Sequence, residues 1–288
     1  MKTAIVTDTN SGMSAAEGRG RGIFILPMPV IIDAKTYKEG VDITNQEVFE
    51  AMQEDRDIST SQPDLLSLEN IWKEAFAAGY DEIVHIPMSS GLSGSCAMAQ
   101  QMAMKYEGKV QVVDNHRISL TMYESVLDAK AMADAGKSAK EIRETLEEHG
   151  LEATIYLIVD TMKYLEKGGR ITHGAAVMGS LFKIKPVLTI QGEKIDAVAK
   201  ARGIVSAKKK FFEFLKKDYE ERFAQYPKEQ IIIGCASTFT DQAQIDEISA
   251  EISNLFPDMT FVYHQLPSSV VCHTGPGTFG GAIVRKLH

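Results

Sequence analysis

The sequence lacks an uninterrupted run of about 18 apolar residues, which is the length that crosses a bilayer as a helix. Its opening residues, MKTAIVTDTN, also lack the charged and then apolar pattern of a signal peptide, because polar residues return at Thr7 and Asp8. Since both features are missing, we expect a soluble, cytoplasmic protein without a transmembrane segment. This expectation leaves room for a transient contact with a membrane surface.

Cysteine is scarce and positive charge is in deficit. The three cysteines, Cys96, Cys235 and Cys272, are odd in number and far apart, with no C-x-x-C pair, so they fit neither a disulfide framework nor a zinc site. We expect them to be reduced and partly buried, and we expect no metal. The net charge of −8 lacks the basic footprint of a protein that binds nucleic acid.

The densest basic run is KKKFFEFLKK, residues 208–217. It places Phe211, Phe212 and Leu215 at helical spacing beneath a cationic surface. We interpret this run first as a solvated helix face and second as a docking surface for an acidic partner.

Nucleotide-binding motifs are missing as well. Neither the pattern G-x-x-x-x-G-K-[ST] nor the pattern G-x-G-x-x-G follows any expected strand. The sequence therefore predicts no nucleotide site and no cofactor held by this chain.

Apolar sequence is plentiful: the 288 residues are 44% hydrophobic, which is enough for two domains. The first half alternates short apolar runs with amphipathic helices, and this rhythm predicts a mainly parallel sheet with flanking helices. Two helix starts carry capping boxes, Thr44 with Glu47 and Ser138 with Glu141. The expected strands are residues 3–7, 22–32, 82–86, 109–113 and 154–159.

The pattern changes near residue 160. Residues 185–200 predict a hairpin, and two long helices, near 204–224 and 240–255, bracket the expected strand QIIIGCA. No linker rich in Gly, Ser or Pro separates the halves. We therefore expect an α/β protein with two tightly packed α/β domains, the second of them α+β, and a ligand in a cleft near their interface. The expected domains are residues 1–159 and 160–288.

Residues 88–95, MSSGLSGS, follow an apolar strand and precede a segment of helical periodicity, so they predict a loop that opens a helix. A helix N-terminus offers N–H groups and partial positive charge, glycines admit a ligand close to the backbone, and serines add donors. We interpret this loop as an anion site for a carboxylate or phosphate, with a purely structural helix cap as the alternative. Its candidate residues are Ser90, Gly91, Ser93 and Gly94.

A nucleophile elbow is a competing interpretation of the same loop. The elbow requires G-x-S-x-G, and the pattern around Ser93 fails because Ser95 stands where the last glycine should be. His273 lies downstream as a candidate base, but no motif marks an acidic partner for it. Anion binding is therefore favoured over nucleophilic catalysis.

A second polar stretch is STSQPD, residues 59–64. Thr60, Ser61 and Gln62 form a short polar loop, and Pro63 suits the first turn of the next helix. On the sequence alone, an ordinary helix cap is favoured here over a binding site.

The Gly-rich stretch HTGPGTFGG predicts a loop that carries His273 and Thr274. A histidine in such a loop either bonds a carboxylate or is only a polar loop residue. Arg170 and Arg202 are isolated cations beside glycines, and each either pairs with an anion or fixes a loop.

Several short motifs occur in order along the chain: AIVTD, LPMPVIID with YKEGVDIT, TSQP, SSGLSG, DTMKYLEKGGRI, GSLFKIKPVLTI and HTGPG. Taken together, they resemble the DegV family of bacterial fatty-acid-binding proteins, and the resemblance covers essentially the whole chain. In fatty acid kinase systems these proteins form the acyl-carrying subunit. One departure is DTNSGMS, beginning at Asp8, where family members carry a run similar to DSTSDL.

The resemblance implies two α/β domains, an acyl chain buried in a tunnel, and a carboxylate held near the domain interface. It implies that Thr60 and Ser93 contact the carboxylate, that His273 assists them, and that Arg202 steadies an acyl phosphate or a kinase contact. Arg170 joins Arg202 in that expected role. The remaining expected fatty-acid contacts are Ser61, Ser90, Gly91, Gly94 and Thr274.

Our first hypothesis is a carrier, not itself an enzyme, that binds one long-chain fatty acid and presents it to a separate fatty acid kinase catalytic subunit for phospholipid synthesis. The ligand is the fatty acid, and the partner supplies ATP and metal. The alternative hypothesis is a serine esterase or acyl transferase with Ser93 as nucleophile and His273 as base. A third is a sensor whose lipid occupancy alters its interaction with another protein.

Overall fold

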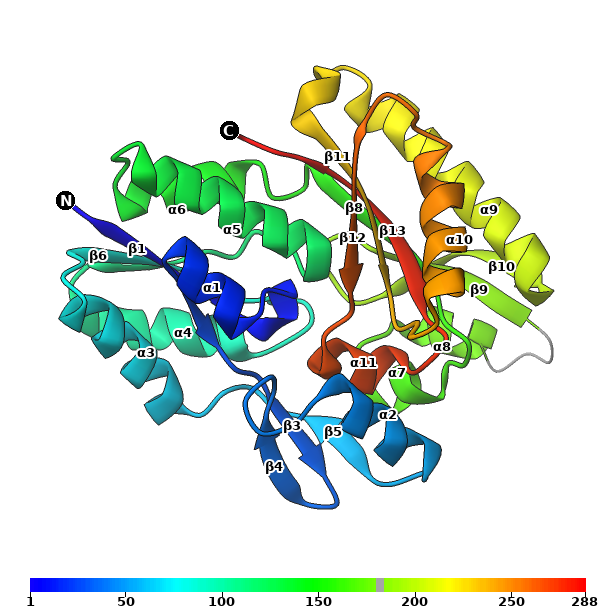
Figure 1. Ribbon diagram of the computed structural model, residues 1–288, viewed down its shortest axis with the longest axis horizontal. Coiled ribbons are helices and arrows are strands. Elements are labelled where there is room, and N and C mark those ends of the chain that lie inside the picture. The colour runs from blue at the N-terminus through cyan, green and yellow to red at the C-terminus, as the bar shows by residue number, and fades with distance from the viewer. Residues whose placement is uncertain (180–183) are drawn as a thin grey trace. The chain divides into compact units, whose positions relative to one another are not determined.

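The structure is a computed structural model that describes residues 1–179 and 184–288. Contacts between residues divide the chain into two compact units, each visible in Figure 1. Unit 1 comprises Met1–Leu151, Pro267–Ser269 and His288, and unit 2 comprises Glu152–Leu266 and Val270–Leu287. Residues 180–183 of the motif GSLFKIKPVLTI lie outside the described residues.

Unit 1 is built on a four-stranded parallel sheet in the order β2-β1-β6-β7. Two helices, α3 and α4, cover one face of this sheet, and α5 and α6 cover the other (Figure 1). The predicted parallel sheet with flanking helices is therefore confirmed. The bounds are β1 Thr3–Asp8, β2 Ile23–Leu26, β6 Glu82–Ile86, β7 Val110–Val112, α3 Leu65–Ala77, α4 Ser95–Ala103, α5 Ser119–Asp134 and α6 Ala139–Glu148.

The core between the sheet and α3 contains Trp72, the single tryptophan of the chain. Its indole Nε1–H donates to Nδ1 of His85 at 3.0 Å, and both side chains are buried. Burial penalises the charged imidazolium and lowers the pKa of His85 to about 3. The His85 ring is therefore neutral and serves as a hydrogen-bond acceptor inside the core.

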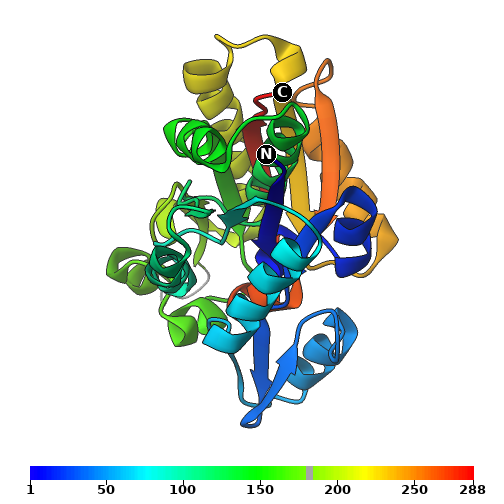
Figure 2. The ribbon, with the colours of Figure 1, turned by 90° about the vertical axis from the view of Figure 1, so that its left-hand side faces the viewer.

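A second sheet of unit 1 has three antiparallel strands in the order β4-β3-β5. Figure 2 shows it together with α2, in blue, at the lower end of the view. The sequence predicted one strand over residues 22–32, but Pro27 and Met28 separate β2 from β3, since proline cannot donate to a strand ladder. The bounds are β3 Pro29–Ile32, β4 Lys35–Lys38, β5 Ile58–Thr60 and α2 Asn45–Gln53.

Both predicted capping boxes are present. Thr44 and Glu47 exchange side-chain and backbone hydrogen bonds at the start of α2, and Ser138 and Glu141 do the same at α6. The short helices of unit 1 are η1 Thr9–Ser11, α1 Ala15–Arg21 and η2 Met104–Tyr106.

Unit 2 is built on a six-stranded sheet in the order β10-β9-β8-β13-β11-β12, in which only β11 and β12 pair in parallel among the described strands. The predicted hairpin is confirmed as β9 and β10. The strand expected at residues 154–159 is β8, which pairs antiparallel here, so its placement in the parallel sheet was wrong. The bounds are β8 Ala153–Ile158, β9 Ile184–Ile190, β10 Asp196–Arg202, β11 Ile231–Ser237, β12 Thr260–Gln265 and β13 Phe279–Arg285.

Helices α9 and α10 pack their apolar sides against this sheet. Phe211 and Leu215 of the basic run are fully buried, as the helical spacing predicted. Within the described residues, no helix is long and apolar enough to span a bilayer. The bounds are α7 Lys163–Gly168, α8 His173–Gly179, α9 Gly203–Asp218, η4 Lys228–Gln230, α10 Gln242–Ser253 and α11 Ser268–Thr274.

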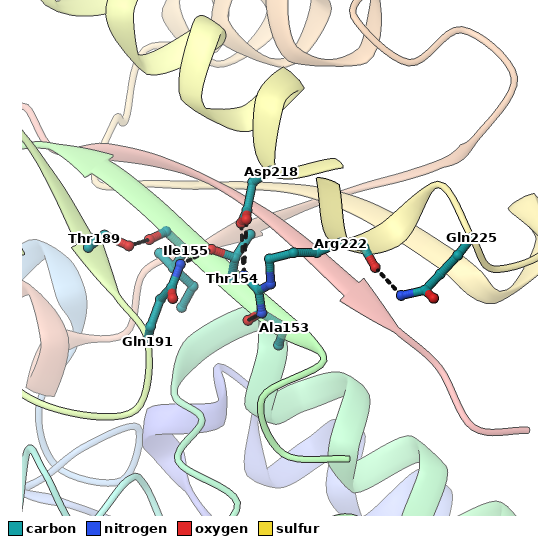
Figure 3. Close-up of polar contacts among 8 residues, drawn as sticks. All are labelled: Ala153, Thr154, Ile155, Thr189, Gln191, Asp218, Arg222 and Gln225. Atoms are coloured by element: carbon teal, nitrogen blue, oxygen red, sulfur yellow. Dashed lines mark hydrogen bonds and ion pairs between the residues drawn. The ribbon is translucent and has the colours of Figure 1, made fainter. Parts of the chain in front are cut away.

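The end of α9 continues into a π-helical turn, η3 Tyr219–Phe223, which a polar network attaches to β8 (Figure 3). Arg222 Nη1 donates to both carboxylate oxygens of Asp218, at 3.1 and 3.0 Å. The Nη2 group of Arg222 donates to the Ala153 carbonyl at 3.4 Å. The ion pair spans one helical turn, and the bond from Arg222 to Ala153 connects that turn to β8.

Candidate functional site

Backbone N–H groups of the loop between β6 and α4 are hydrogen-bonded to protein acceptors. The Ser89 N–H donates to the Arg117 carbonyl at 2.9 Å, and the Ser90 N–H donates to Asp114 Oδ1 at 3.2 Å. The next three N–H groups along the chain all bond to Ser89, through its hydroxyl or its carbonyl. These loop amides therefore shape the loop and are already occupied by protein acceptors.

The first turn of α4 keeps its donors open. Among the described residues, the N–H groups of Gly94, Cys96 and Ala97 have no hydrogen-bond acceptor. The Ser93 hydroxyl oxygen accepts from the Ser95 N–H at 3.2 Å and from the Ser95 hydroxyl at 3.0 Å. The predicted helix-opening loop is confirmed, and its unpaired donors lie at the helix start, where the partial positive charge of the helix is also located.

The STSQPD stretch lies against the same turn within unit 1. Gln62 Oε1 lies 2.8 Å from the point that a Cβ on Gly94 would occupy, and Gln62 Nε2 lies 3.5 Å from Met98 Sδ. Half-buried Thr60 ends β5, two residues before Gln62. Unit 1 therefore brings the loop of Thr60 and its exposed neighbour Ser61 together with the start of α4.

The helix after STSQPD begins later than the sequence predicted. Asp64 is its N-cap and accepts a hydrogen bond from the Ser67 N–H at 2.8 Å, so Pro63 precedes the cap instead of lying in the first turn. The stretch STSQPD therefore does supply an ordinary helix cap, as the sequence favoured, but through Asp64 and not through the hydroxyl of Thr60 or Ser61.

A buried carboxylate at the end of β1 was missed by the sequence analysis. Asp8 Oδ1 accepts from the N–H and the amide Nδ2 of Asn10, at 2.9 and 2.8 Å, and Oδ2 accepts from the Met88 N–H at 3.1 Å. Burial, only partly offset by these hydrogen bonds, raises the pKa of Asp8 to about 6. Asp8 thus connects β1 to the first residue of the 88–95 loop.

A second buried carboxylate, Glu39, lies in the same cluster. Glu39 Oε1 accepts from the Ser269 N–H at 2.9 Å, and Oε2 accepts from the Ser269 hydroxyl at 2.7 Å and from the Thr9 hydroxyl. Burial raises the pKa of Glu39. The signal that could have found both acids is the departing run DTNSGMS, since its Thr9 and Asn10 are the residues that contact them.

In unit 2, His273 and Arg170 lie close together. His273 is in the last turn of α11, not in a loop as predicted, because the helix continues until the chain turns at Gly275 with φ 75°. Arg170 Nη1 donates to the Gly168 carbonyl, and a Cβ on Gly168 would lie 2.3 Å from His273 Nδ1. Burial, and then the charge of Arg170, lower the pKa of His273 to about 4, so its ring is neutral at neutral pH.

The other two predicted residues of unit 2 are placed differently. The Thr274 hydroxyl donates to the Val270 carbonyl at 3.2 Å, inside its own helix. Arg202 is exposed and is the last residue of the seven-residue strand β10. Ile195, just before the other end of this strand, donates its N–H to the Arg170 carbonyl and pairs with Ile171. Such a strand spans about 20 Å. Unit 2 therefore groups Arg170 with His273 and leaves Arg202 apart.

The described residues contain no group of three or more His, Cys, Asp or Glu side chains that could hold a metal ion. All three cysteines are buried thiols, and burial raises the pKa of both Cys96 and Cys235 to about 12. Within unit 1, hydroxyl and amide donors gather at the start of α4, and within unit 2 the neutral imidazole of His273 lies near the guanidinium of Arg170.

The fold is therefore that of a two-unit α/β protein in which, among the described residues, the start of helix α4 carries N–H groups without an acceptor. The family model described as "Uncharacterised protein, DegV family" matches residues 2–286, and the chain belongs to this family. A DegV domain-containing protein of Deinococcus radiodurans is 30% identical over 285 residues, which cover 98% of each chain.

Solved structures give the same assignment. The structure described as fatty acid binding of a DegV family protein from Thermus thermophilus is 26% identical, with a TM-score of 0.86, and covers 99% of this chain and 100% of that one. A stearic-acid-binding protein from Eubacterium ventriosum has a TM-score of 0.87 at 22% identity, covering 99% and 98% of the two chains. At that identity, the second structure supports the fold alone.

Proposed function

We propose that this protein binds one long-chain fatty acid and that unit 1 holds the carboxylate through Thr60, Ser93 and the first turn of α4. One observation carries the proposal: within the part of the chain that the structure describes, the N–H groups of Gly94, Cys96 and Ala97 and the proton of the Ser93 hydroxyl have no acceptor at this helix start. A carboxylate has about four lone-pair sites, so it matches several donors at once. The fatty acid bound by the relative from Thermus thermophilus supports this ligand class.

Neutral donors suit a carrier better than a buried cation would. A carboxylate paired with a buried guanidinium is difficult to release, because separation leaves an uncompensated charge in the interior. Hydroxyl and amide donors hold the anion through charge-assisted hydrogen bonds without that penalty. The acyl chain supplies most of the affinity, at about 0.8 kcal/mol for each buried CH₂ group.

We infer that the protein is not itself a kinase and that a separate fatty acid kinase catalytic subunit phosphorylates the bound carboxylate. Arg170 offers a planar guanidinium that can engage a phosphate with two hydrogen bonds. His273 lies beside it as a neutral ring, which can bond the acyl head group without adding charge. Exposed Arg202, set apart from this pair, suits a contact with the kinase.

The serine esterase alternative receives little support from the same geometry. A serine nucleophile needs a base that accepts its proton and a lone pair aimed at the carbonyl carbon. The Ser93 oxygen already accepts two hydrogen bonds from Ser95, so the hydroxyl can form a further hydrogen bond only as a donor. Such a hydroxyl is arranged to donate to an anion.

The proposal is tested by organic extraction and mass spectrometry of the protein purified from a bacterial host. We expect one equivalent of a long-chain fatty acid in the wild type and in the Ser59→Ala control, and a loss of this ligand in a Thr60→Ala, Ser93→Ala double variant. Ser59 is an exposed serine on β5, next to Thr60. An empty protein that also fails to take up added fatty acid would overturn the proposal.

The kinase part is tested separately. The loaded protein is incubated with ATP and a bacterial fatty acid kinase catalytic subunit, and acyl phosphate is measured. We expect acyl phosphate only when both proteins are present, with Arg170→Ala abolishing it while fatty acid stays bound. Fatty acid retention without any acyl phosphate would leave a carrier and remove the kinase assignment.

A further inference from the structure

Ser95 directs both of its polar groups to one neighbour. The residue is 3% exposed, and it is the first residue of the nine-residue helix α4. Its N–H donates to Ser93 Oγ at 3.2 Å and its hydroxyl donates to the same oxygen at 3.0 Å. Because the buried Ser95 hydroxyl has no other acceptor among the described residues, its proton is committed to Ser93.

These two hydrogen bonds determine which hydrogen-bonding role remains for the Ser93 hydroxyl. A serine hydroxyl has one donor and two acceptor positions. With Ser95 filling both acceptor positions, Ser93 has only its own O–H left for a ligand. The Ser95 N–H also belongs to the positive end of α4, so both bonds polarise the Ser93 O–H toward the ligand side.

We propose that Ser95 is a positioning residue that makes Ser93 a dedicated donor and thereby gives the site its preference for a carboxylate over a head group that must itself donate. This inference rests on the proposed fatty acid binding. A fatty alcohol of equal length buries the same chain, but its hydroxyl proton finds no acceptor at Ser93. Removing the Ser95 hydroxyl returns one acceptor position to Ser93, and the alcohol gains a partner there.

The test compares the dissociation constants of a long-chain fatty acid and of the primary alcohol of equal chain length on delipidated protein at pH 8. For Ser95→Ala we expect the fatty acid to bind about tenfold more weakly, the effect of losing support for one charge-assisted hydrogen bond. Alcohol affinity should stay the same or rise, so that the ratio of the two constants falls at least about tenfold. Ser95→Thr should restore the ratio, and the exposed Ser59→Ala should leave it unchanged.

A structural role for Ser95 gives a different result, because loosening the turn weakens both ligands equally and keeps the ratio. That outcome overturns the inference while leaving the proposed function intact. A wild-type protein that binds no fatty acid overturns both. If Ser95→Ala does not fold, Ser95→Cys gives the same test, since a thiol fills the space left by the hydroxyl but is a weak donor and should also lower the ratio.

Discussion

At the scale of single residues, His85 makes the stability of unit 1 depend on pH. Its pKa is lowered to about 3 in the folded protein, so the folded state favours the neutral ring, whereas an unfolded histidine titrates near pH 6.5. The contribution of this neutral ring is fully present above pH 6.5. This contribution is lost as the pH falls from 6.5 toward 3, because His85 becomes protonated in the unfolded chain while it stays neutral in the folded chain.

A His85→Leu variant isolates this effect. Below pH 6.5 the wild type should lose about 1.4 kcal/mol of unfolding free energy per pH unit relative to the variant. Urea unfolding at pH 7.5 and pH 5, followed by the fluorescence of Trp72, measures the difference directly, since Trp72 is the only tryptophan and bonds to His85. Equal losses in both proteins would contradict the assignment of a buried neutral ring.

Gly168 sets the position of His273. A Cβ on Gly168 would lie 2.3 Å from His273 Nδ1, so Gly168→Ala must displace the ring. We expect the pKa of His273, measured by NMR titration, to rise from about 4 toward its ordinary value, and acyl phosphate formation to fall while fatty acid stays bound. Gly174→Ala in α8 is the matched control, because a Cβ there meets nothing within 4 Å. An unchanged His273 titration in Gly168→Ala would refute this account.

At the scale of elements, the contact between Gln62 and Gly94 aligns two loops from different parts of unit 1. A Gly94→Ala substitution places a methyl group 2.8 Å from Gln62 Oε1. Because that amide ends a flexible side chain, the fold should survive, but we expect fatty acid affinity to fall about fivefold to tenfold, the effect of one weakened hydrogen bond.

Two further variants control this prediction. Gln62→Ala combined with Gly94→Ala should recover part of the affinity by removing the clash. Gly20→Ala, in an open position of α1, should leave binding unchanged. Isothermal titration with a long-chain fatty acid measures all of them, and full affinity in Gly94→Ala alone would show that the two loops act independently.

The sequence predicted local features of these elements well and distant ones poorly. Capping boxes at Thr44 and Ser138 depend on residues three apart, and both are present. The strand at residues 154–159 was recognised but assigned to the wrong sheet, because an apolar run fits either sheet and its partner, β13, is far along the chain. His273 was expected in a loop, since the two apolar residues and one cysteine before it are too few to display helical periodicity.

In the candidate site, too, the residues set by local sequence could be predicted and those set by distant contacts could not. The helix-opening loop with Ser93 could be predicted because strand, turn and helix are contiguous. Thr60 was favoured only through the family resemblance, since nothing in its own neighbourhood points to Gly94. The buried acids Asp8 and Glu39 were missed because the contacts that bury them come from Met88 and Ser269, which are distant in sequence.

At the scale of the whole molecule, each unit contains a buried thiol that reports on its opening. Cys96 lies in α4 of unit 1 and Cys235 in β11 of unit 2, and burial raises the pKa of both to about 12. Only thiolates react quickly with alkylating reagents, so labelling requires the unit to open.

Fatty acid at ten times its dissociation constant should slow alkylation of Cys96 about tenfold, by mass action on unit 1. Cys235 should be slowed less, because the proposed head-group site is at the start of α4 in unit 1. Peptide mapping by mass spectrometry measures both rates in one sample. Identical slowing at both cysteines would mean that the units open as one.

Unit 1 includes residues 267–269, which are synthesised much later than its other main segment, residues 1–151. A ribosome completes residues 1–151 long before it reaches Ser269, so the nascent unit 1 has no Ser269 donors for Glu39. Until they arrive, the Glu39 carboxylate has to remain hydrated, because burial without those bonds is too costly. A chain that terminates early therefore keeps the region of unit 1 around Glu39 loosened and open to proteases, and near-complete translation becomes a condition for burying this carboxylate.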